Sequence, residues 1–513
     1  MEHEGTVRPV RATRREWVGL AVLALACLLY AMDLTVLHLA VPRLSADLRP
    51  SSAQLLWIID IYGFLVAGSL ITMGTLGDRI GRRKLLLIGA GAFGLASLLA
   101  AFSTSAEMLI VSRALMGVAG ATLAPSTLSL IFNMFLDPKQ RSVAIGVWIA
   151  SFSAGGAIGP VLGGLLLEHF WWGSVFLLAL PVMAVLLILG PRVLPEFRDP
   201  EAGRLDLVSA GLSLAALLAV IYGLKQIAQD GFGPMPVLSI LAGLVVGVLF
   251  VQRQRRLADP IIDLRLFRIR AFSASLAAYM LSIFVAFGYF LFVAQYLQLV
   301  LGLSPLQAGL WSLPSGAGFI VGSLLAPMIV HRARPALVMG SGLSLAAVAL
   351  VALTQVGGSS SLPLLVAASS IIALSLAPVV TLATELVVGS APPERAGAAS
   401  GISETSAELG GALGIAILGS IGTAVYRSEV IDAIPAGVPA EAAEAARDTL
   451  GGAVEIAAQL PDQLGAPLLA AAREAFTHGL HLTAAISAAV AIAVAILAAS
   501  LLRRVRGRSE SQP

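Results

Sequence analysis

Long apolar runs recur along nearly the whole chain, and short polar segments separate them. A helix needs about 20 residues to cross a bilayer, and most of these runs have that length. Membrane-spanning strands are shorter, with only about ten alternating residues, so the pattern predicts helices. We place fourteen spanning helices near residues 17–41, 53–76, 84–103, 106–131, 140–167, 173–192, 205–224, 236–254, 271–300, 305–330, 334–354, 361–389, 396–425 and 476–502.

The composition agrees with a chain that folds in lipid. Of its 513 residues, 58% are apolar and 12% are charged, about half the charged fraction of an average soluble protein. Backbone groups in lipid are satisfied only in helices and closed barrels, so we expect an all-α membrane protein. The first run has basic residues before it but no small-residue cleavage site, so it reads as an uncleaved span rather than a signal peptide.

The basic residues indicate the orientation. An even number of spans places both termini on one side, and most of the 33 Lys and Arg lie in the loops and tails of that side. By the positive-inside rule, this side is the cytoplasm. Orientation accounts for these charges and the net charge is only +3, so we expect no binding of nucleic acid.

Two further features limit the possible functions. The polar insert 426–475 lies on the opposite side, and its Ala/Glu-rich stretches predict an external helical hairpin, either a tether or a gating element. Cys27 is the only cysteine, which excludes a disulfide or a cysteine-based metal site within one chain. No GxxxxGK[ST] loop is present, so we expect no nucleotide, metal or other cofactor, and any transport would use an ion gradient or a partner.

Acids inside the predicted spans are few, and each needs a reason because a charge at mid-bilayer costs roughly 2.5–3.5 kcal/mol. Asp33 lies in the first span, one turn after Tyr30. Asp60 lies in the second span between Trp57 and Phe64, which places an acid and two aromatic rings on one helix face. A carboxylate beside aromatic faces attracts delocalised cations.

A second pair of acids, Glu404 and Glu408, lies one turn apart on one face of the thirteenth span. Two stacked carboxylates cannot both ionise cheaply in lipid, so we expect at least one to take up a proton. Arg113 in the fourth span is the obvious buried cation for these acids, and an Asp33–Arg113 pair is expected if their spans touch. The alternative is that the acids only fix helix packing.

The remaining acids near the spans have simpler explanations. Glu107, Glu168 and Glu385 lie near predicted helix ends, where we expect interfacial water to solvate them. Asp206 precedes the seventh span and reads as a helix N-terminal acid, which the helix dipole favours.

Glycine-rich patterns mark two places where helices approach closely. In the fifth span, small residues at four-residue spacing allow close packing and a proline permits a bend; they are Gly155, Gly156, Gly159, Pro160, Gly163 and Gly164. After the second span comes a basic, glycine-rich loop with Gly74, Gly77, Asp78, Arg79, Gly81, Arg82 and Arg83.

These motifs resemble those of the major facilitator superfamily. The loop from Gly74 to Arg83 resembles its loop motif, the run from Leu109 through Arg113 to Ala121 resembles its fourth-span motif, and the run from Gly155 to Gly164 resembles the motif of its antiporters. Asp33-x-Thr35-Val36 before Pro42 is similar to the first-span motif of fourteen-span drug:proton antiporters. Residues 57–62, 263–267 and the outer hairpin resemble the QacA-type antiseptic exporters.

The resemblance covers essentially the whole chain and implies a fold and a function. It implies two six-helix bundles, at 17–192 and 271–502, with two inserted helices at 205–254 between them and cytoplasmic termini at 1–16 and 503–513. It further implies a multi-pass protein of the bacterial inner membrane that works as a monomer, exchanges protons for lipophilic cations and confers multidrug resistance. Asp33, Arg113, Glu404 and Glu408 would couple protons, while Asp78 with Arg82 and Arg83 would hold the cytoplasmic side closed in one state.

Two departures from the QacA-type pattern bear on the substrate. Phe319 stands where such proteins can carry an acid in the tenth span, and Ser403 stands where some carry a further glutamate. Fewer negative sites should favour monovalent over divalent cations. The expected substrate-binding residues are Tyr30, Asp33, Trp57, Asp60, Phe64, Phe319, Glu404 and Glu408. An exporter of one natural product, an uptake symporter and a lipid-handling protein remain as alternatives.

Overall fold

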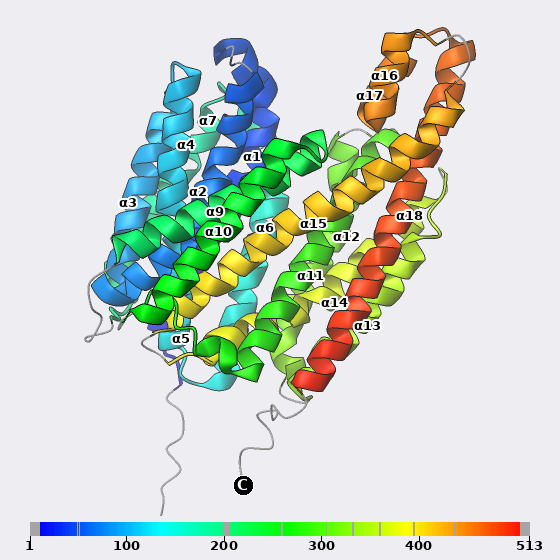
Figure 1. The fold of residues 1–513 in the computed structure, drawn as a ribbon. Helices are drawn as coiled ribbons and strands as arrows, with labels where there is room; N and C mark the ends of the chain where they lie inside the picture. The colour runs from blue at the N-terminus through cyan, green and yellow to red at the C-terminus, as the bar shows by residue number, and fades with distance from the viewer. Residues whose placement is uncertain are drawn as a thin grey trace, which may run out of the picture.

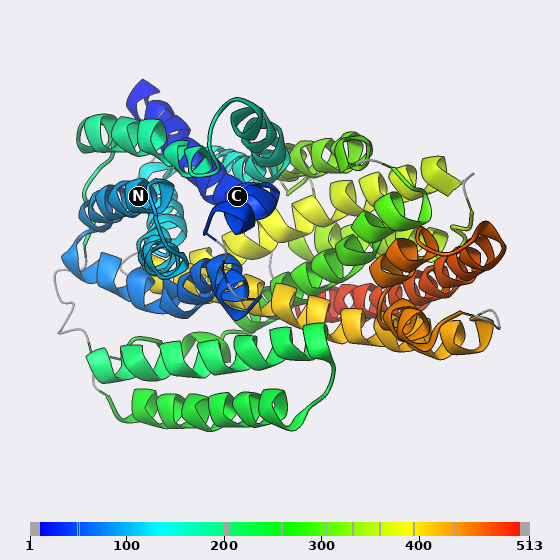
Figure 2. The same ribbon diagram turned by 90° about the horizontal axis from the view of Figure 1, so that it is seen from above.

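The computed structural model describes residues 11–48, 50, 52–198, 206–257, 260–303, 305–330, 333–358, 361–392, 395–434 and 438–502. Within these residues fourteen helices are long and apolar enough to cross a membrane, as the sequence pattern predicts. They form two bundles, with two further helices along one side (Figures 1 and 2).

The first bundle contains α1 to α8, whose ends follow local sequence signals. The bounds are α1 (Arg14–Leu48), α2 (Ser52–Ile80), α3 (Arg82–Ala101), α4 (Ala106–Gly120), α5 (Leu123–Met134), α6 (Pro138–His169), α7 (Ser174–Leu177) and α8 (Ala179–Val193). Gly81 separates α2 from α3 with φ 110°, a conformation that glycine adopts without strain. Asp137 caps α6 by accepting hydrogen bonds from the backbone of Lys139 and Gln140, as N-cap acids do.

The fourth span is not one continuous helix. It divides into α4 and α5 at a turn around Ala121 and Thr122. Pro125 follows within α5 and has no N–H to donate to the carbonyl of residue 121, which accounts for a break at this position. The sequence prediction of a single helix over 106–131 missed this division.

The second bundle contains six long helices. These are α11 (Arg270–Gln295), α12 (Pro305–Val330), α13 (Pro335–Leu353), α14 (Leu362–Gly389), α15 (Ala396–Ala433) and α18 (Asp462–Leu501), with short turns η1 (Leu266–Arg268) and η2 (Tyr296–Val300) beside α11. Glycines let α15 approach α11 closely, since a Cβ on Gly410 would overlap the carbonyl oxygen of Met280. α12 packs along α14, and α13 packs against α14 and α18.

The inserted helices α9 (Leu207–Asp230) and α10 (Pro234–Arg256) pack on each other and lie along one side of the molecule (Figure 2). α9 contacts α2 of the first bundle and α15 of the second. Asp206 caps α9, as the sequence predicts, and it also pairs with Arg253 near the end of α10 at 2.8 Å. The guanidinium of Arg253, which donates a hydrogen bond to it, holds the pKa of Asp206 well below its usual range.

The insert 426–475 continues the neighbouring helices. α15 runs to Ala433 and α18 begins at Asp462, so both helices extend well past the predicted spans, and α16 (Ala440–Asp448) and α17 (Leu450–Ala457) lie between them. The Tyr426 hydroxyl donates a hydrogen bond to the Ala446 carbonyl at 2.6 Å. The Ala/Glu-rich sequence has high helix propensity, which allows the spanning helices to continue outside the apolar region.

The two bundles meet at one end and diverge at the other (Figure 1). Contacts between them join α2 and α5 to α15 and join α6 to α12 and α14. The α2–α15 contact joins the last turns of α2 to the first turns of α15, at the end where the described chain begins and finishes (Figure 1). We call this the closed end and the other the open end.

Candidate functional site

The ion pair expected between Asp33 and Arg113 is present inside the first bundle. Nη1 of Arg113 on α4 lies 2.7 Å from Oδ2 of Asp33 on α1. Arg113 is 1% exposed, and its Nε donates a hydrogen bond to the Ile58 carbonyl of α2 at 3.3 Å. Removing one partner of a buried ion pair destabilises a protein by about 3–5 kcal/mol, because the other charge is left buried without compensation. Asp33 and Arg113 therefore stabilise each other in the fold.

Aromatic rings surround this pair. The guanidinium of Arg113 lies over the Tyr62 ring at 4.6 Å, a distance at which cation–π attraction contributes. The Tyr62 ring in turn lies 6.2 Å from that of Tyr30, and the Tyr30 ring lies 5.8 Å from Phe152 on α6. Tyr30, which the sequence places one turn before Asp33, is thus buried in contact with Tyr62 and Phe152.

The two acids of α15 approach the same tyrosine from the second bundle. Both Glu404 and Glu408 interact electrostatically with Tyr30 of α1 and with Tyr279 of α11. Oε1 of Glu404 is buried and accepts no hydrogen bond from any residue that the structure describes. Tyr30 is therefore near the α15 acids, and through its contact with Tyr62 it is also linked to the Asp33–Arg113 pair.

The remaining predicted binding residues lie elsewhere. Phe64 is buried against Ile221 of α9, and Trp57, which is 44% exposed, contacts Phe64 with ring centroids 6.3 Å apart. This face of α2 therefore points toward the inserted helices. The side chain of Asp60 lies outside the described residues. Phe319 is half-buried on α12, against the main apolar core.

The loop motif forms a contact between the bundles at the closed end. Arg82 is completely buried and forms an ion pair with Asp78. The other carboxylate oxygen of Asp78 accepts a hydrogen bond at 3.0 Å from the backbone N–H of Ala398, in the first turn of α15. The N–H groups in the first turn of a helix have no partner within the helix, and they lie at the positive end of its dipole. Asp78 of the first bundle therefore stabilises the start of α15 in the second.

Arg83 of the loop motif contacts its own bundle. Arg83 donates a hydrogen bond from Nη1 to the Leu194 carbonyl at 3.1 Å, and its Nε lies 3.6 Å from the Glu196 carboxylate. The sequence interpretation paired Arg83 with Arg82 in closing the cytoplasmic side. In this structure Gly74, Asp78 and Arg82 approach α15, while Arg83 joins α3 to the segment after α8.

The glycines of α6 form a close contact with α1. A Cβ on Gly155 would overlap the Leu28 carbonyl, and a Cβ on Gly163 would lie 2.8 Å from Val36. Those on Gly156 and Gly164 would meet nothing within 4 Å in the described structure. Gly159 and Pro160 lie on the same helix, which continues unbroken past the proline. Gly155 and Gly163 thus face α1 and allow the close packing that the small-residue pattern predicts.

Three contributors to the closed end were not found by sequence analysis. Glu385, expected to be solvated at a helix end, is buried in α14 and accepts a hydrogen bond at 2.7 Å from Ser142 of α6. A Cβ on Gly397 would overlap the guanidinium of Arg82. Ile261, in the segment after α10, is fully buried, and its carbonyl accepts a hydrogen bond from Thr75 of α2. The position of these residues near helix ends in the sequence does not predict these contacts, because the contacts depend on how the bundles and the segment after α10 pack together.

Comparison with known proteins gives consistent results. The family model described as Major Facilitator Superfamily matches residues 23–415. The multidrug efflux pump LfrA of Mycolicibacterium smegmatis is 45% identical over 94% of this chain and 96% of that protein. The methyl viologen resistance protein SmvA of Salmonella typhimurium is 37% identical over 92% of this chain and 95% of that protein. The tetracenomycin C resistance and export protein of Streptomyces glaucescens is 32% identical over 91% and 88%.

Solved structures are similar in fold. The human organic anion transporter MFSD10 superposes with a TM-score of 0.60 at 16% identity, covering 94% of this chain and 99% of that one. An inward-facing bacterial homologue of the human lysosomal transporter Spinster gives a TM-score of 0.57 at 19% identity, covering 96% and 99%. At these identities the likeness shows the fold alone.

Proposed function

Because this chain belongs to the major facilitator superfamily, we propose that it is a proton-coupled antiporter that exports hydrophobic, mainly monovalent cations across the bacterial inner membrane. Relatives named as multidrug efflux and drug-resistance proteins support the export of drugs. The positive-inside distribution of Lys and Arg supports cytoplasmic termini, which makes the closed end the cytoplasmic end.

The observation that carries this proposal is the arrangement of acids around Tyr30. Asp33 has its charge balanced by Arg113, whereas Glu404 presents a buried carboxyl oxygen that no described residue contacts by a hydrogen bond. A carboxyl group in this setting can take up a proton or, when ionised, attract a lipophilic cation. The aromatic rings of Tyr30 and Tyr279, which both interact with these acids, provide faces for a delocalised cation.

The proposed cycle requires that protons and the cation occupy the acids in turn. With the open end exposed to the outside, Asp33 and one glutamate of α15 are protonated. Opening of the cytoplasmic end releases these protons at higher pH, and the carboxylates then attract the cation. After return to the outward-open state, protonation displaces the cation.

The energy available is sufficient for concentrative export. Each pH unit of gradient contributes about 1.4 kcal/mol per proton. A membrane potential adds roughly 2.3 kcal/mol per net charge per 100 mV. Exchange of two protons for one monovalent cation would therefore use both components of the proton gradient.

A preference for monovalent cations follows from the few acids in the site. Phe319 and Ser403 are neutral where similar exporters can carry acids, and Ser403 is fully buried on α15. One relative is named for resistance to methyl viologen, which is a dication, so this compound provides a direct comparison. Export of methyl viologen as fast as that of a monocation of similar size would contradict the preference.

The main experiment uses everted membrane vesicles with a preformed pH gradient that a pH-sensitive dye reports. Adding ethidium or tetraphenylphosphonium should dissipate the gradient promptly in the wild type. Asp33→Asn should abolish this response, because the variant cannot release the coupled proton. Glu444→Gln removes an exposed acid of α16 and serves as the matched control, with a response like that of the wild type.

Other outcomes separate the alternatives. Concentrative export by Asp33→Asn would remove Asp33 from the coupling role. Proton movement in the same direction as the substrate would identify an uptake symporter. If only one antibiotic or natural product dissipates the gradient, the protein is a specific exporter; relatives named for puromycin and tetracenomycin C resistance make these compounds the first to test. Absence of any substrate-dependent proton flux would favour a lipid-handling role.

A further inference from the structure

The inserted helices take no part in the proposed cycle, yet the segment that follows them is buried at the closed end. Residues 260–266 lie between α10 and α11, and Ile261, Ile262 and Leu266 are buried. Their side chains share one apolar cluster with Ile71 of α2 and with residues of the second bundle. We call residues 260–266 the strap. Its partners in the second bundle are Phe272 and Leu276 of α11, Val387 of α14, and Ala399 and Ile402 of α15.

The backbone of the strap has hydrogen-bond partners on two different elements. Connecting segments usually run over the surface, because buried backbone groups need such partners. Here the N–H of Ile261 donates a hydrogen bond to Oε1 of Gln254 on α10 at 2.8 Å. The carbonyl of the same residue accepts a hydrogen bond at 3.2 Å from the hydroxyl of Thr75 on α2. Ile261 therefore joins an inserted helix to the first bundle, while its side chain packs in the cluster shared with the second.

Gln254 belongs to a chain of hydrogen bonds that begins on the inserted helices. It is 2% exposed, and its Nε2 donates a hydrogen bond to Oγ of Ser209 on α9 at 2.7 Å. The Ser209 hydroxyl in turn donates at 2.7 Å to Oδ2 of Asp206, the residue that caps α9. Within the described structure, the hydrogen bonds of Gln254 reach α9 and the strap but neither bundle. A buried polar network of this kind favours one geometry, here the position of the strap against α10.

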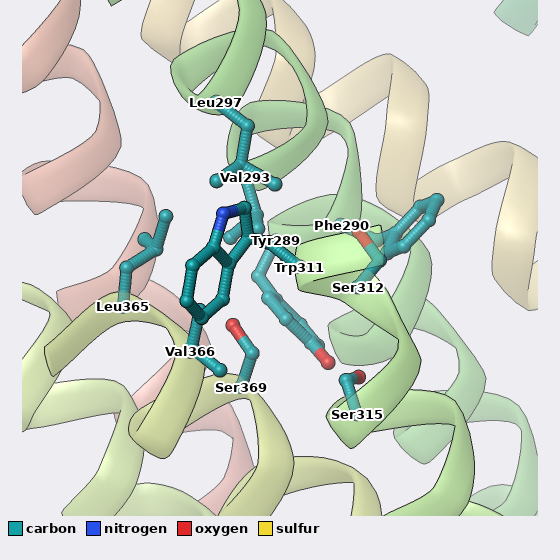
Figure 3. Close-up of a pocket in the computed structure, with 10 residues that line it drawn as sticks. All are labelled: Tyr289, Phe290, Val293, Leu297, Trp311, Ser312, Ser315, Leu365, Val366 and Ser369. Atoms are coloured by element: carbon teal, nitrogen blue, oxygen red, sulfur yellow. The ribbon is translucent and has the colours of Figure 1, made fainter. Parts of the chain in front are cut away.

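Opening of the closed end has to release the strap from one bundle. In the second bundle, side chains of α11, α12 and α14 surround the space between these helices (Figure 3), and about 10 Å³ of it is free, room for roughly one water. With packing this tight, we expect these helices to move together. The strap packs against Ile71 of the first bundle and against Ile402 of the second, so separation of the bundles exposes apolar side chains of the strap.

We propose that the strap fastens the cytoplasmic end in the closed state and that Gln254, through its hydrogen bond to Ile261, is the positioning residue for it. The inserted helices thereby set how readily the protein opens to the cytoplasm. Without Gln254 the N–H of Ile261 is left buried and unpartnered, a penalty that is relieved when the strap leaves the closed end for water. The inference goes beyond the proposed function and uses it only to assign the closed end to the cytoplasm. It does not depend on the coupling ion or on the substrate.

The test follows a reporter thiol at a contact between the bundles that contains no residue of the strap. Ser323→Cys places this thiol where α12 meets Gly146 of α6. Ser323 is fully buried, as is Cys27, the only native cysteine. Purified protein in lipid nanodiscs, which expose both faces, is labelled with a charged maleimide without substrate or pH gradient. Adding Gln254→Leu should raise the labelling rate of this thiol roughly five-fold or more, the shift expected from one unpartnered buried N–H.

Two comparisons separate the positioning of the strap from general packing of the inserted helices. Ser239→Ala removes another hydrogen bond between α10 and α9, from the Ser239 hydroxyl to the Ala219 carbonyl at 2.8 Å, and should leave labelling unchanged. Thr75→Val removes the hydroxyl that the carbonyls of Ile71 and Ile261 share and should raise labelling. Thr75→Ser, which keeps the hydroxyl, should stay close to the rate of the reporter alone. Thermal unfolding of each variant shows whether it is folded.

Unchanged labelling of the reporter in folded Gln254→Leu would overturn the proposal, and unchanged labelling in Thr75→Val would do so even if Gln254→Leu does not fold. An equal increase in Ser239→Ala would also overturn it, because general loosening of α9 and α10 would then open the protein. The result is separate from that of the vesicle experiment. Faster labelling in Gln254→Leu, together with no cation-dependent proton flux in the wild type, would support the strap and contradict the proposed function.

Discussion

A single methyl group at Gly397 tests whether the contact of Asp78 and Arg82 with α15 stabilises the cytoplasm-closed state. Gly397 lies in the first turn of α15 against the fully buried guanidinium of Arg82. A Cβ at this position would overlap that guanidinium, so Gly397→Ala requires Arg82 to move away from Asp78 or the bundles to separate. We expect this contact to be broken when the cytoplasmic end opens, so the methyl group should then meet no such neighbour.

The size of the effect follows from the burial of the pair. Separating one partner of a buried ion pair costs about 3–5 kcal/mol. If this cost falls on the closed state alone, the equilibrium shifts toward the open state by roughly a hundred- to several-thousandfold, because each 1.4 kcal/mol is tenfold. Exchange between states should then be impaired, and proton-coupled export should fall accordingly.

Cysteine accessibility measures this shift. Ser323 is fully buried where α12 meets α6, and its hydroxyl has no partner within the described structure, so Ser323→Cys is a conservative reporter. The thiol of Ser323→Cys should be protected from a thiol reagent when this is the only substitution. It should be labelled from the cytoplasm when Gly397→Ala is added. Gly419→Ala, where a Cβ meets Leu291 at an ordinary 3.4 Å, is the control on the same helix. Unchanged protection and export in Gly397→Ala would refute the reasoning.

Two other variants test separate parts of the fold. Gly155→Ala should destabilise the protein by roughly 1–3 kcal/mol through overlap with α1. Gly156→Ala, whose Cβ meets no described atom within 4 Å, should match the wild type in thermal unfolding. Equal effects of the two substitutions would show that Gly155 does not make the α1 contact. Asp206→Asn should lower the melting temperature by at most about 2 °C. Because Arg253 lowers the pKa of Asp206, this stabilisation is present above the usual carboxyl range and should fade as the pH falls below about 4; a difference that grows in acid would contradict the pairing.

The sequence predicted the helices and the buried ion pair for identifiable reasons. Apolar runs of spanning length determine the number of helices, because lipid leaves few alternatives for the backbone. Asp33 and Arg113 could be paired in advance because an isolated charge in lipid is too costly to leave without a partner. The glycine spacing of α6 likewise indicated a close helix contact before its partner, α1, was known.

The contacts between bundles could not be predicted in the same way. Asp78 acts on the backbone N–H of Ala398, and any residue except proline would supply that group, so the side chain at 398 gives no signal. Glu385 reads as an interfacial acid from its place in α14, but the neighbouring bundle covers it and Ser142 binds it. Such pairings depend on how the two bundles are placed relative to each other, and the hydropathy pattern of the sequence does not determine that placement.

The position of Tyr30 connects the two halves of the proposed cycle. In this state Asp33 is neutralised by Arg113 within the first bundle, while Glu404 in the second bundle has a buried oxygen that no described group binds. A cation attracted by Glu404 would therefore approach Tyr30 without first meeting a free carboxylate on α1. Protonation of Asp33 would release Arg113, whose guanidinium already lies over Tyr62, and would leave a positive charge near the cation through the Tyr62–Tyr30 contact. Repulsion between these charges would make proton and cation occupancy mutually exclusive, which is the condition that antiport requires.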